Sequence, residues 1–283
     1  MARASASSAA SAPDISVVVP VFDEAGAAPG LAREIAQAFR GRNYEMIFVD
    51  DASRDGTKAV LQAMQAEIPR LRVLAHRKNS GQSRALRSGI LAARGQVIVT
   101  LDGDGQNDPA DGPALVDALM AGPWELALVG GERVKRQDSA AKKVASRIGN
   151  GVRKRLLKDT ANDTGCGLKA FRREAFLRLP YFDHIHRYLP ALMQREGYLT
   201  AFRPVNHRHR QTGASKYTNL GRLWASLSDL FGVIWLQSRA RDPGGVDELQ
   251  ALQVRAERII TTTATSTKRE TTCSMTKPRD RRS

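Results

Sequence analysis

The sequence predicts an α/β domain with a doubly wound, mostly parallel sheet. In its front half, short apolar runs rich in β-branched residues alternate with longer segments whose apolar residues recur at helical spacing. Short strands that alternate with helices of about ten residues form right-handed βαβ units around a buried parallel sheet. The expected strands are Ile15–Val21, Tyr44–Asp50, Leu71–Ala75, Gln96–Leu101 and Leu126–Val129.

The helices expected between these strands follow from the spacing of their apolar residues. They are Leu31–Arg40, Thr57–Ile68, Gln82–Arg94 and Pro113–Ala121. After residue 133 the pattern changes, and the stretch Gly165–Asn206 has mixed α/β character. A single α/β domain over residues 14–238 therefore accounts for most of the chain.

The segment 133–158 is strongly basic, with ten Lys or Arg residues and one acid. Apolar residues at roughly helical spacing, among them Val144 and Ile148, give it an amphipathic pattern. Two interpretations fit equally well. The segment is either a solvated basic helix or a face that meets anionic lipid.

The overall charge indicates an anionic partner. The 283 residues carry 44 Lys and Arg against 29 Asp and Glu, a formal net charge of +15. Nucleic acid, anionic lipid and phosphorylated substrates all match that sign. Cys166 and Cys273 lie too far apart to form a metal-ligand or redox pair, so a reducing compartment is expected.

The ends of the chain differ from the domain between them. Residues 1–13 are small and polar without an apolar core, so we expect a disordered lead-in rather than a signal peptide. Residues 239–283 form a polar tail, largely disordered, with one amphipathic piece at Val246–Ile260. Within the helix expected at 220–238, the apolar run Leu223–Leu236 is too short to span a membrane and contains Asp229. This helix either packs on its own domain or lies at a membrane surface.

In open α/β sheets, ligands bind beyond the carboxyl ends of the strands, so the residues after each strand are candidates. The first strand ends in Pro20-Val21-Phe22-Asp23-Glu24, without the glycines of a phosphate-binding loop. The second ends in Asp50-Asp51, and Ser53–Thr57 then reads as a helix cap. Adjacent acids at a strand tip fit contacts with a base or a ribose.

The fourth strand ends in Asp102-Gly103-Asp104-Gly105-Gln106. Two carboxylates two residues apart can turn toward one Mg²⁺ or Mn²⁺ when a glycine lets the backbone bend. An ordinary Asp/Gly turn is the alternative. A calcium loop is excluded, because its sixth and twelfth positions would be Asn107 and Pro113 instead of Gly and Glu.

A further loop, Arg210-Gln211-Thr212-Gly213-Ala214-Ser215-Lys216-Tyr217, joins two cations to a glycine. Arg and Lys of this kind neutralise phosphates. Without context, a basic surface loop explains the same residues.

Together, VVVPVFDEA, FVDDASRDGT, HRKNSGQSRALRSGI, LDGDGQNDP and RQTGASKY resemble the motifs of family-2 glycosyltransferases. The resemblance is to the polyprenyl-phosphate sugar transferases typified by dolichol-phosphate mannose synthase, and it covers about Ile15 to Trp235. It implies a glycosyltransferase domain over 14–238 with the nucleotide-sugar (GT-A) fold. Each motif alone is weak, whereas their number and order are specific.

The resemblance implies a role for individual residues. The metal ligands are Asp102, Asp104 and Gln106. The nucleotide-sugar contacts are Pro20, Phe22, Glu24, Asp50, Asp51, Asn79, Gly81, Asp102, Gly103 and Arg133. The catalytic groups are Asp104, Arg210 and Lys216, and the candidates for the acceptor phosphate are Asp163, Lys169, Arg187 and Ser215.

Two departures from the family pattern shape the expected function. Cys166 stands where some relatives have an acid, and no pair of C-terminal membrane-spanning helices follows. The first leaves a catalytic carboxylate there unsupported. The second favours peripheral attachment to the cytoplasmic face of the membrane, with an integral-membrane protein as a further partner in cell-envelope synthesis.

The resemblance implies inverting transfer of a hexosyl group from a nucleotide-diphosphate sugar to a polyprenyl phosphate. The alternative is a hydroxyl acceptor, soluble or protein-bound, for which Asp163 or Asp183 would act as the base. A nucleic-acid-binding protein is disfavoured, because aromatic residues make up only 6% and acids at strand tips repel a phosphate backbone.

Overall fold

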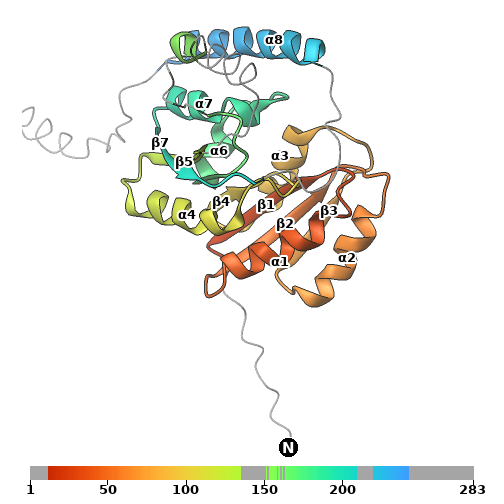
Figure 1. Ribbon diagram of the computed structural model, residues 1–283. Helices are drawn as coiled ribbons and strands as arrows, with labels where there is room; N and C mark the ends of the chain where they lie inside the picture. Colours follow the sequence, from red (N-terminus) through yellow and green to blue (C-terminus); the bar gives the residue numbers. More distant parts are fainter. Residues whose placement is uncertain are drawn as a thin grey trace, which may run out of the picture. The chain divides into compact units, whose positions relative to one another are not determined.

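A computed structural model describes residues 12–134, 151, 153–157, 159, 161, 163–208 and 219–241, with side chains of α8 from Leu227 onward. Its centre is a seven-stranded sheet of order β3-β2-β1-β4-β6-β5-β7 (Figure 1). Strand β6 is antiparallel to β4 and β5, and the other neighbouring pairs are parallel. The predicted doubly wound, mostly parallel sheet is confirmed.

The strands are β1 Ile15–Val21, β2 Tyr44–Asp50, β3 Leu71–Ala75, β4 Val97–Thr100, β5 Leu126–Arg133, β6 Lys169–Arg172 and β7 Leu199–Val205. The α-helices are α1 Ala28–Ala38, α2 Thr57–Glu67, α3 Gln82–Ala92, α4 Gly112–Ala121, α6 Arg173–Arg178, α7 Leu189–Arg195 and α8 Asn219–Ser238. Two 3-10 turns lie at Pro109–Asp111 and Ile185–Arg187.

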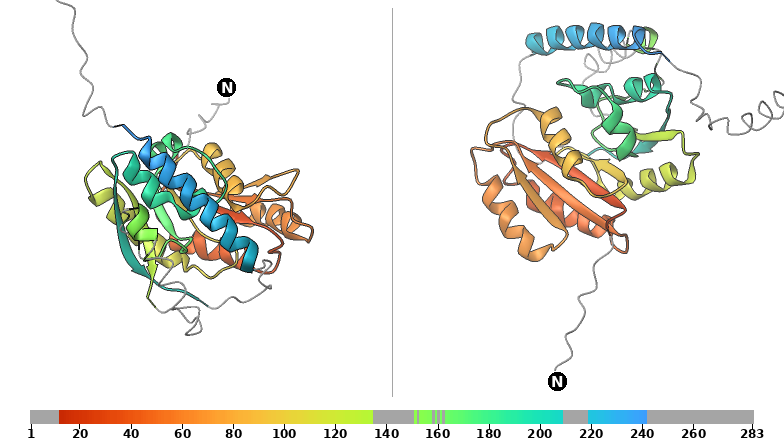
Figure 2. Two further views of the ribbon diagram at one scale, coloured as in Figure 1. Left: turned by 90° about the horizontal axis from the view of Figure 1, so that it is seen from above. Right: turned by 180° about the vertical axis from the view of Figure 1, so that it is seen from behind.

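Alternate residues of β1 pack into two different hydrophobic cores. Val17, Val19 and Val21 pack with α1, α2 and α4, whereas Val18 packs with α3, α6, α7 and α8. Side chains alternate across a strand, so the continuous apolar run of β1 is buried on both faces, as parallel strands require. The two groups of helices cover opposite faces of the sheet (Figures 1 and 2).

The expected elements agree with the observed ones except near their ends. Strands β1, β2 and β3 have the expected bounds, whereas β5 continues four residues beyond Val129 to Arg133. Helix α1 begins at Ala28 instead of Leu31, because Pro29 suits the first turn of a helix. The stretch 165–206, expected only as mixed, supplies β6 and β7, and the antiparallel course of β6 was not foreseen.

Helix α8 has a buried side and an exposed side. Val233 and Leu230 pack into the second core, whereas Leu227, Phe231 and Trp235 are 41%, 68% and 58% exposed. Helix α8 therefore packs on its own domain, whereas its place at a membrane surface stays a prediction. Within the described part of the chain, no helix has the length and apolar character needed to cross a membrane.

Most of the basic segment 133–158 lies outside the described residues. In its described part, Arg153 and Leu157 are buried, and Arg155 and Leu156 are exposed. Arg153 donates to Asp159 at 2.5 Å and to the Ala161 carbonyl at 2.7 Å. This basic residue therefore makes contacts inside the protein and does not belong to an exposed basic face. The chain divides into two compact units after Arg241, close to the expected start of the tail.

Candidate active site

The strand order reverses between β1 and β4, and this is where the acidic strand tips meet. In the sheet, β2 and β3 follow one another on one side of β1, whereas β4 lies on the other side of β1. In open α/β sheets this switch point forms a crevice at the carboxyl ends of the strands. The structure places the residues after β1, β2 and β4 at this edge.

Gly103 packs directly against the end of β1. A Cβ atom on Gly103 would lie 2.6 Å from the Pro20 carbonyl oxygen and 2.7 Å from a Val21 methyl group. The glycine expected to let the turn bend is needed for this close approach instead. The left-handed residue of the turn is Gly105, with φ of 73°.

Asp102 and Asp104 lie on the turn after β4, as the sequence predicts. The Asp102 N–H donates to Asn107 Oδ1 at 2.9 Å, and the Gln106 N–H donates to Asp104 Oδ1 at 3.1 Å. Burial and the nearby Asp104 carboxylate raise the pKa of Asp102. Two carboxylates that repel each other in this way form a favourable place for a cation.

A second glycine, in the loop that leads into β6, approaches the Asp102 carboxylate. A Cβ atom on Gly167 would lie 2.2 Å from Asp102 Oδ2, so any side chain at Gly167 would collide with the carboxylate. The Gly167 carbonyl accepts a hydrogen bond from Thr100 Oγ1 at 2.8 Å, which holds this backbone against β4.

Lys169 lies close to Asp102. The turn Asp102–Gln106, which carries the predicted metal ligands, is called the metal turn below. Its side chain is 4% exposed, and its ammonium donates to the Cys166 carbonyl. Burial lowers the pKa of Lys169, and the charge of Asp102 opposes that shift. This position favours compensation of the Asp102 charge over contact with an acceptor phosphate.

Arg133, at the end of β5, pairs with Asp163 in bidentate fashion. Its Nε and Nη2 atoms donate to the two Asp163 oxygens at 2.6 and 2.8 Å, with both side chains largely buried. The positive charge of Arg133 also acts to lower the pKa of Asp102, against the larger effect of burial. Two residues proposed for different substrates thus form one pair.

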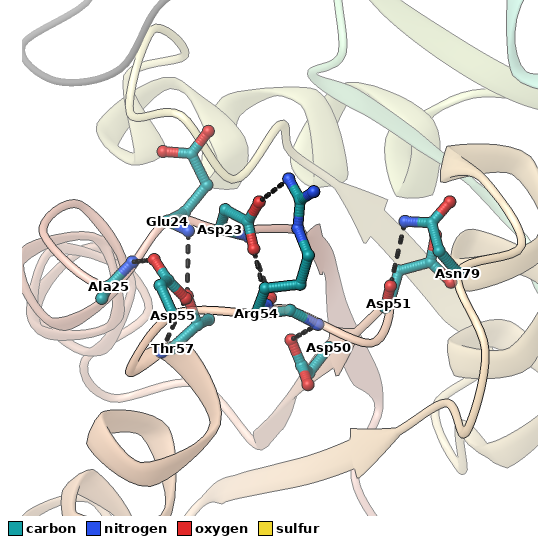
Figure 3. Close-up of polar contacts among 10 residues, drawn as sticks. Asp23, Glu24, Ala25, Asp50, Asp51, Arg54, Asp55, Thr57 and Asn79 are labelled. Atoms are coloured by element: carbon teal, nitrogen blue, oxygen red, sulfur yellow. Dashed lines mark hydrogen bonds and ion pairs between the residues drawn. The ribbon is translucent and has the colours of Figure 1, made fainter. Parts of the chain in front are cut away.

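The tips of β1 and β2 are joined by hydrogen bonds (Figure 3). The N–H groups of Asp23, Glu24 and Ala25 donate to Ser53, Thr57 and Asp55 at 2.9, 2.9 and 3.2 Å. Arg54 donates to both Asp23 oxygens and lies over the Phe22 ring, 5.3 Å from its centre. The segment read as a helix cap therefore also fixes the loop after β1.

Asp51 has a structural role that the sequence did not reveal. Its carboxylate accepts from the N–H groups of Ser80 and Gly81 at 2.9 and 2.7 Å, and it contacts His76 Nδ1 at 2.6 Å. Asn79 donates to the Asp51 carbonyl at 3.0 Å (Figure 3). Asp51 thus anchors the β3–α3 loop, and contact of Asp50 or Asp51 with a nucleobase stays a prediction.

Arg210, Ser215 and Lys216 lie outside the described residues. The chain that leads to them is nevertheless attached to the metal turn, because the Arg208 N–H donates to the Gln106 carbonyl at 2.9 Å. Arg208 also pairs with Asp108 at 2.7 Å and with Glu34 at 2.5 Å. Arg208, two residues before the loop read as phosphate-binding, therefore lies beside Gln106, a predicted metal ligand.

The segment 183–188 contains Arg187, and it contacts helices on both of its sides. His186 Nδ1 contacts Ser83 Oγ on α3 at 2.7 Å, and His184 Nδ1 contacts Asp229 Oδ2 on α8 at 2.8 Å. Sequence reasoning missed both histidines. No local motif marks them, because their partners lie 103 and 45 residues away.

The mostly parallel sheet with helices on both faces is the fold of the GT-A glycosyltransferases. Residues 16–179 match the model of the family described as "Glycosyl transferase family 2". The chain belongs to this family, and the resemblance drawn from its motifs is confirmed.

Relatives with assigned names are similar over most of the chain. Dodecaprenyl-phosphate galacturonate synthase of Rhizobium johnstonii is 33% identical over 82% of this chain and 69% of its own length. Undecaprenyl-phosphate 4-deoxy-4-formamido-L-arabinose transferase of Aeromonas hydrophila is 34% identical over 72% of this chain and 62% of its own length. The match thus spans less than two thirds of the arabinose transferase.

Solved structures share the fold. Glucosyl-3-phosphoglycerate synthase from Mycobacterium tuberculosis, in complex with phosphoglyceric acid, superposes with a TM-score of 0.61 at 21% identity, covering 87% of this chain and 86% of that chain. The same enzyme with Mn²⁺, UDP-glucose and glycerol 3-phosphate gives a TM-score of 0.60 at 21% identity, covering 86% of each chain. At this identity the likeness concerns the fold alone.

Proposed function

We propose that this glycosyltransferase moves a hexosyl or related sugar from a nucleotide-diphosphate sugar to a polyprenyl phosphate, with inversion. The observation that carries the proposal is the Asp102–Asp104 turn at the switch point of the sheet, beside the joined tips of β1 and β2. The relatives named for dodecaprenyl-phosphate and undecaprenyl-phosphate products support the acceptor. Their sugars differ from one another, so the donor stays open.

The carboxylates fit a divalent cation. The raised pKa of Asp102, caused by burial and by Asp104, marks a place where added positive charge is stabilising. Among the residues described, no group of three or more His, Cys, Asp or Glu forms a closed metal site. Asp102, Asp104 and Gln106 would therefore hold Mg²⁺ or Mn²⁺ together with oxygens of the substrate diphosphate.

A bound cation supplies stabilisation of the negative charge that develops on the departing nucleotide diphosphate. Basic side chains of the protein would stabilise the same negative charge. Arg133, paired with Asp163, adds positive charge near Asp102, and Arg210 and Lys216 follow Arg208 in the chain. In this proposal Arg210 and Lys216 bind the phosphates, and the tips of β1 and β2 bind the nucleoside.

The geometry favours a phosphate acceptor over a hydroxyl acceptor. A hydroxyl needs a base, whereas an ionised phosphate is already a nucleophile at neutral pH. Of the two candidate bases, Asp163 is engaged by Arg133, and exposed Asp183 accepts from the His184 N–H at 2.9 Å. Arg187 and Ser215 stay as candidates for holding the acceptor phosphate.

We infer that the reaction takes place at the cytoplasmic membrane surface, because a polyprenyl chain stays in the bilayer. The exposed Leu227, Phe231 and Trp235 of α8 recur every four residues, so they form one apolar stripe that would lie in the lipid interface. The net charge of +15 favours an anionic surface. Flotation with vesicles tests this, and binding independent of anionic lipid contradicts it.

The substitution Asp104→Ala tests the metal mechanism. We expect turnover to fall by at least about a hundredfold, because one of two carboxylate ligands is lost. Excess EDTA should abolish wild-type turnover, and Mn²⁺ or Mg²⁺ should restore it. Asp117→Ala, which removes an exposed carboxylate on α4, is the matched control. Full activity of Asp104→Ala, or of the wild type in EDTA, excludes the mechanism.

The donor and acceptor are identified by one panel. Labelled UDP- and GDP-sugars are incubated with polyprenyl phosphate, with and without the cation, and glycolipid products are separated. Transfer that needs the lipid phosphate supports the proposal. Transfer to water-soluble hydroxyl acceptors without any lipid phosphate supports the alternative.

A further inference from the structure

Two histidines connect the segment 183–188 to helices on opposite sides. His184 contacts Asp229 of α8 at 2.8 Å, and His186 contacts Ser83 of α3 at 2.7 Å. The two imidazole rings meet edge to face, with centroids 6.4 Å apart. A continuous series of contacts therefore runs from α8 to the start of α3.

His184 is held in a conformation that a histidine seldom adopts. Its φ is 62° and its ψ is 10°, in the left-handed region. Non-glycine residues occupy that region mainly where surrounding contacts impose it. The hydrogen bond to Asp229 is such a contact, because it attaches this backbone to a helix 45 residues away.

His186 contacts the first turn of α3, which also donates a hydrogen bond to the metal turn. Ser83, its partner, is 1% exposed, and the preceding residue Gln82 donates to Asp102 Oδ1 at 2.8 Å. Burial, aided by the charge of Lys169, holds the pKa of His186 well below 6.5, so the ring is neutral. Adjacent residues of α3 thus bind the metal turn and the segment 183–188.

Asp229 belongs to the same helix as the exposed apolar stripe, two residues from Leu227 and from Phe231, and its side chain is turned toward His184. Any partner that fixes this stripe also fixes Asp229. The stripe ends in Trp235, whose ring lies 5.8 Å from the Arg239 guanidinium. An aromatic ring beside a cation at the end of an apolar stripe matches the interface of a lipid bilayer.

We propose that His184 and His186 are positioning residues that couple the seating of α8 on a lipid surface to the site for the acceptor phosphate. The proposal rests on the proposed function. Lipid contact at the stripe fixes Asp229, the His184 bond then fixes the segment 183–188, and Arg187 is held facing the acceptor. The His186–Ser83 bond keeps this segment aligned with the metal turn.

Three substitutions of His184 separate the hydrogen bond from the backbone conformation. Asn places a polar atom near the position of Nδ1 and tolerates the left-handed region. Gly tolerates that region but has no side chain. Gln neither places a polar atom near the position of Nδ1 nor favours the left-handed region. The readouts are the KM for polyprenyl phosphate in anionic vesicles and the Kd for a nucleotide diphosphate with Mn²⁺.

We expect His184→Asn to stay within about threefold of the wild-type KM, and His184→Gly and His184→Gln to raise it about tenfold or more, the effect of losing a hydrogen bond to a charged group. The Kd for the nucleotide should not change. In the same way, His186→Asn should keep a KM close to that of the wild type, and His186→Gln should raise it. A wild-type KM in His184→Gly, or a loss of nucleotide affinity that parallels the rise in KM, overturns the proposal.

A second measurement does not depend on the reaction. Hydrogen exchange at residues 183–188 should slow when anionic vesicles are added to the wild type, and not when they are added to His184→Gly. Equal protection in both proteins, or none in the wild type, refutes the coupling. Absence of transfer to polyprenyl phosphate together with this protection would reject the proposed function and leave the coupling standing.

Discussion

At the scale of single residues, the site depends on close approaches that leave no room for side chains. The Asp102 carboxylate fits between Gln82, which donates to it, and the backbone of Gly167. Gly103 packs on Pro20 in the same way. The acids are held in place by Gly103 of their own turn and by Gly167 of the loop before β6, so activity should depend on positions that carry no functional group.

Gly167→Ala should therefore reduce activity although it removes no functional group. Its Cβ atom would lie 2.2 Å from Asp102 Oδ2, so the carboxylate must rotate or the strand must shift. We expect kcat/KM to fall at least about tenfold, with a higher Mn²⁺ requirement. Gly30→Ala, where a Cβ would have nothing within 4 Å, is the control. Unchanged metal dependence in Gly167→Ala would show that this contact is not needed.

Glu45, on β2, should make stability depend on pH. Burial alone would raise the pKa of Glu45, but hydrogen bonds from the Arg94 N–H, Arg72 and Ser16 outweigh it and lower the pKa below 4.5. A lowered pKa means stabilisation that is present above pH 4.5 and is lost as the pH falls through the folded-state pKa. We expect Glu45→Gln to cost about 2 kcal/mol at pH 7 and to weaken this loss.

Urea unfolding at pH 7 and at pH 4 measures both effects of Glu45→Gln. The exposed carboxylate of Glu67, paired with Arg33, provides the control. Glu67→Gln should change stability much less, because solvent screens an exposed pair. Equal losses for the two variants would mean that the buried hydrogen bonds of Glu45 contribute nothing.

At the scale of elements, α8 combines two functions in one helix. Its inner side packs on α7 (Figure 2) and completes the second core. Its outer side presents the apolar stripe of Leu227, Phe231 and Trp235. Arg195 and Gln237 add hydrogen bonds that fasten α8, to Leu236 and Leu157 carbonyls at 3.0 Å each. These two bonds fasten the C-terminal end of α8 to its domain, while its outer stripe stays exposed.

Phe231→Glu should weaken binding to vesicles without unfolding the domain. Phe231 is 68% exposed, so the substitution loses lipid contact and adds a charge that anionic lipid repels. We expect an affinity loss of about tenfold or more in flotation, with an unchanged unfolding midpoint. Met120→Glu, at a 59% exposed position on α4, is the control. A similar loss in both variants would place the membrane contact outside α8.

At the scale of the whole molecule, cation and nucleotide should stabilise the fold jointly. The described residues offer an open pair of carboxylates, not a closed metal site. Mn²⁺ alone should therefore raise the unfolding midpoint little, whereas Mn²⁺ with the correct nucleotide diphosphate at a hundred times its Kd should add about 2.7 kcal/mol. Calorimetry with UDP and GDP in parallel measures this. Full stabilisation by the nucleotide in EDTA would contradict shared coordination.

Much of the fold could be predicted from the sequence, because a parallel strand buried on both faces is a continuous apolar run between helices. The bounds of β1 and β2, which are buried throughout, follow from such runs, and those of the half-buried edge strand β3 follow from a shorter one. Strand β6 was missed, because KAFR is short and carries charge at both ends. The antiparallel course of β6 depends on its partners β4 and β5, which no local pattern names.

By itself, the sequence determined the α/β class, the acidic strand tips and the Asp102–Asp104 turn, since these are local patterns of apolar runs followed by acids and glycines. The tertiary structure alone decided which acids remain available to a ligand. It bound Asp163 to Arg133, enclosed Asp51 in the β3–α3 loop and buried Lys169 beneath Asp102. It also linked His184 and His186 to α8 and α3. Such pairings join residues far apart in the chain, so they exist only once the sheet brings its strands together.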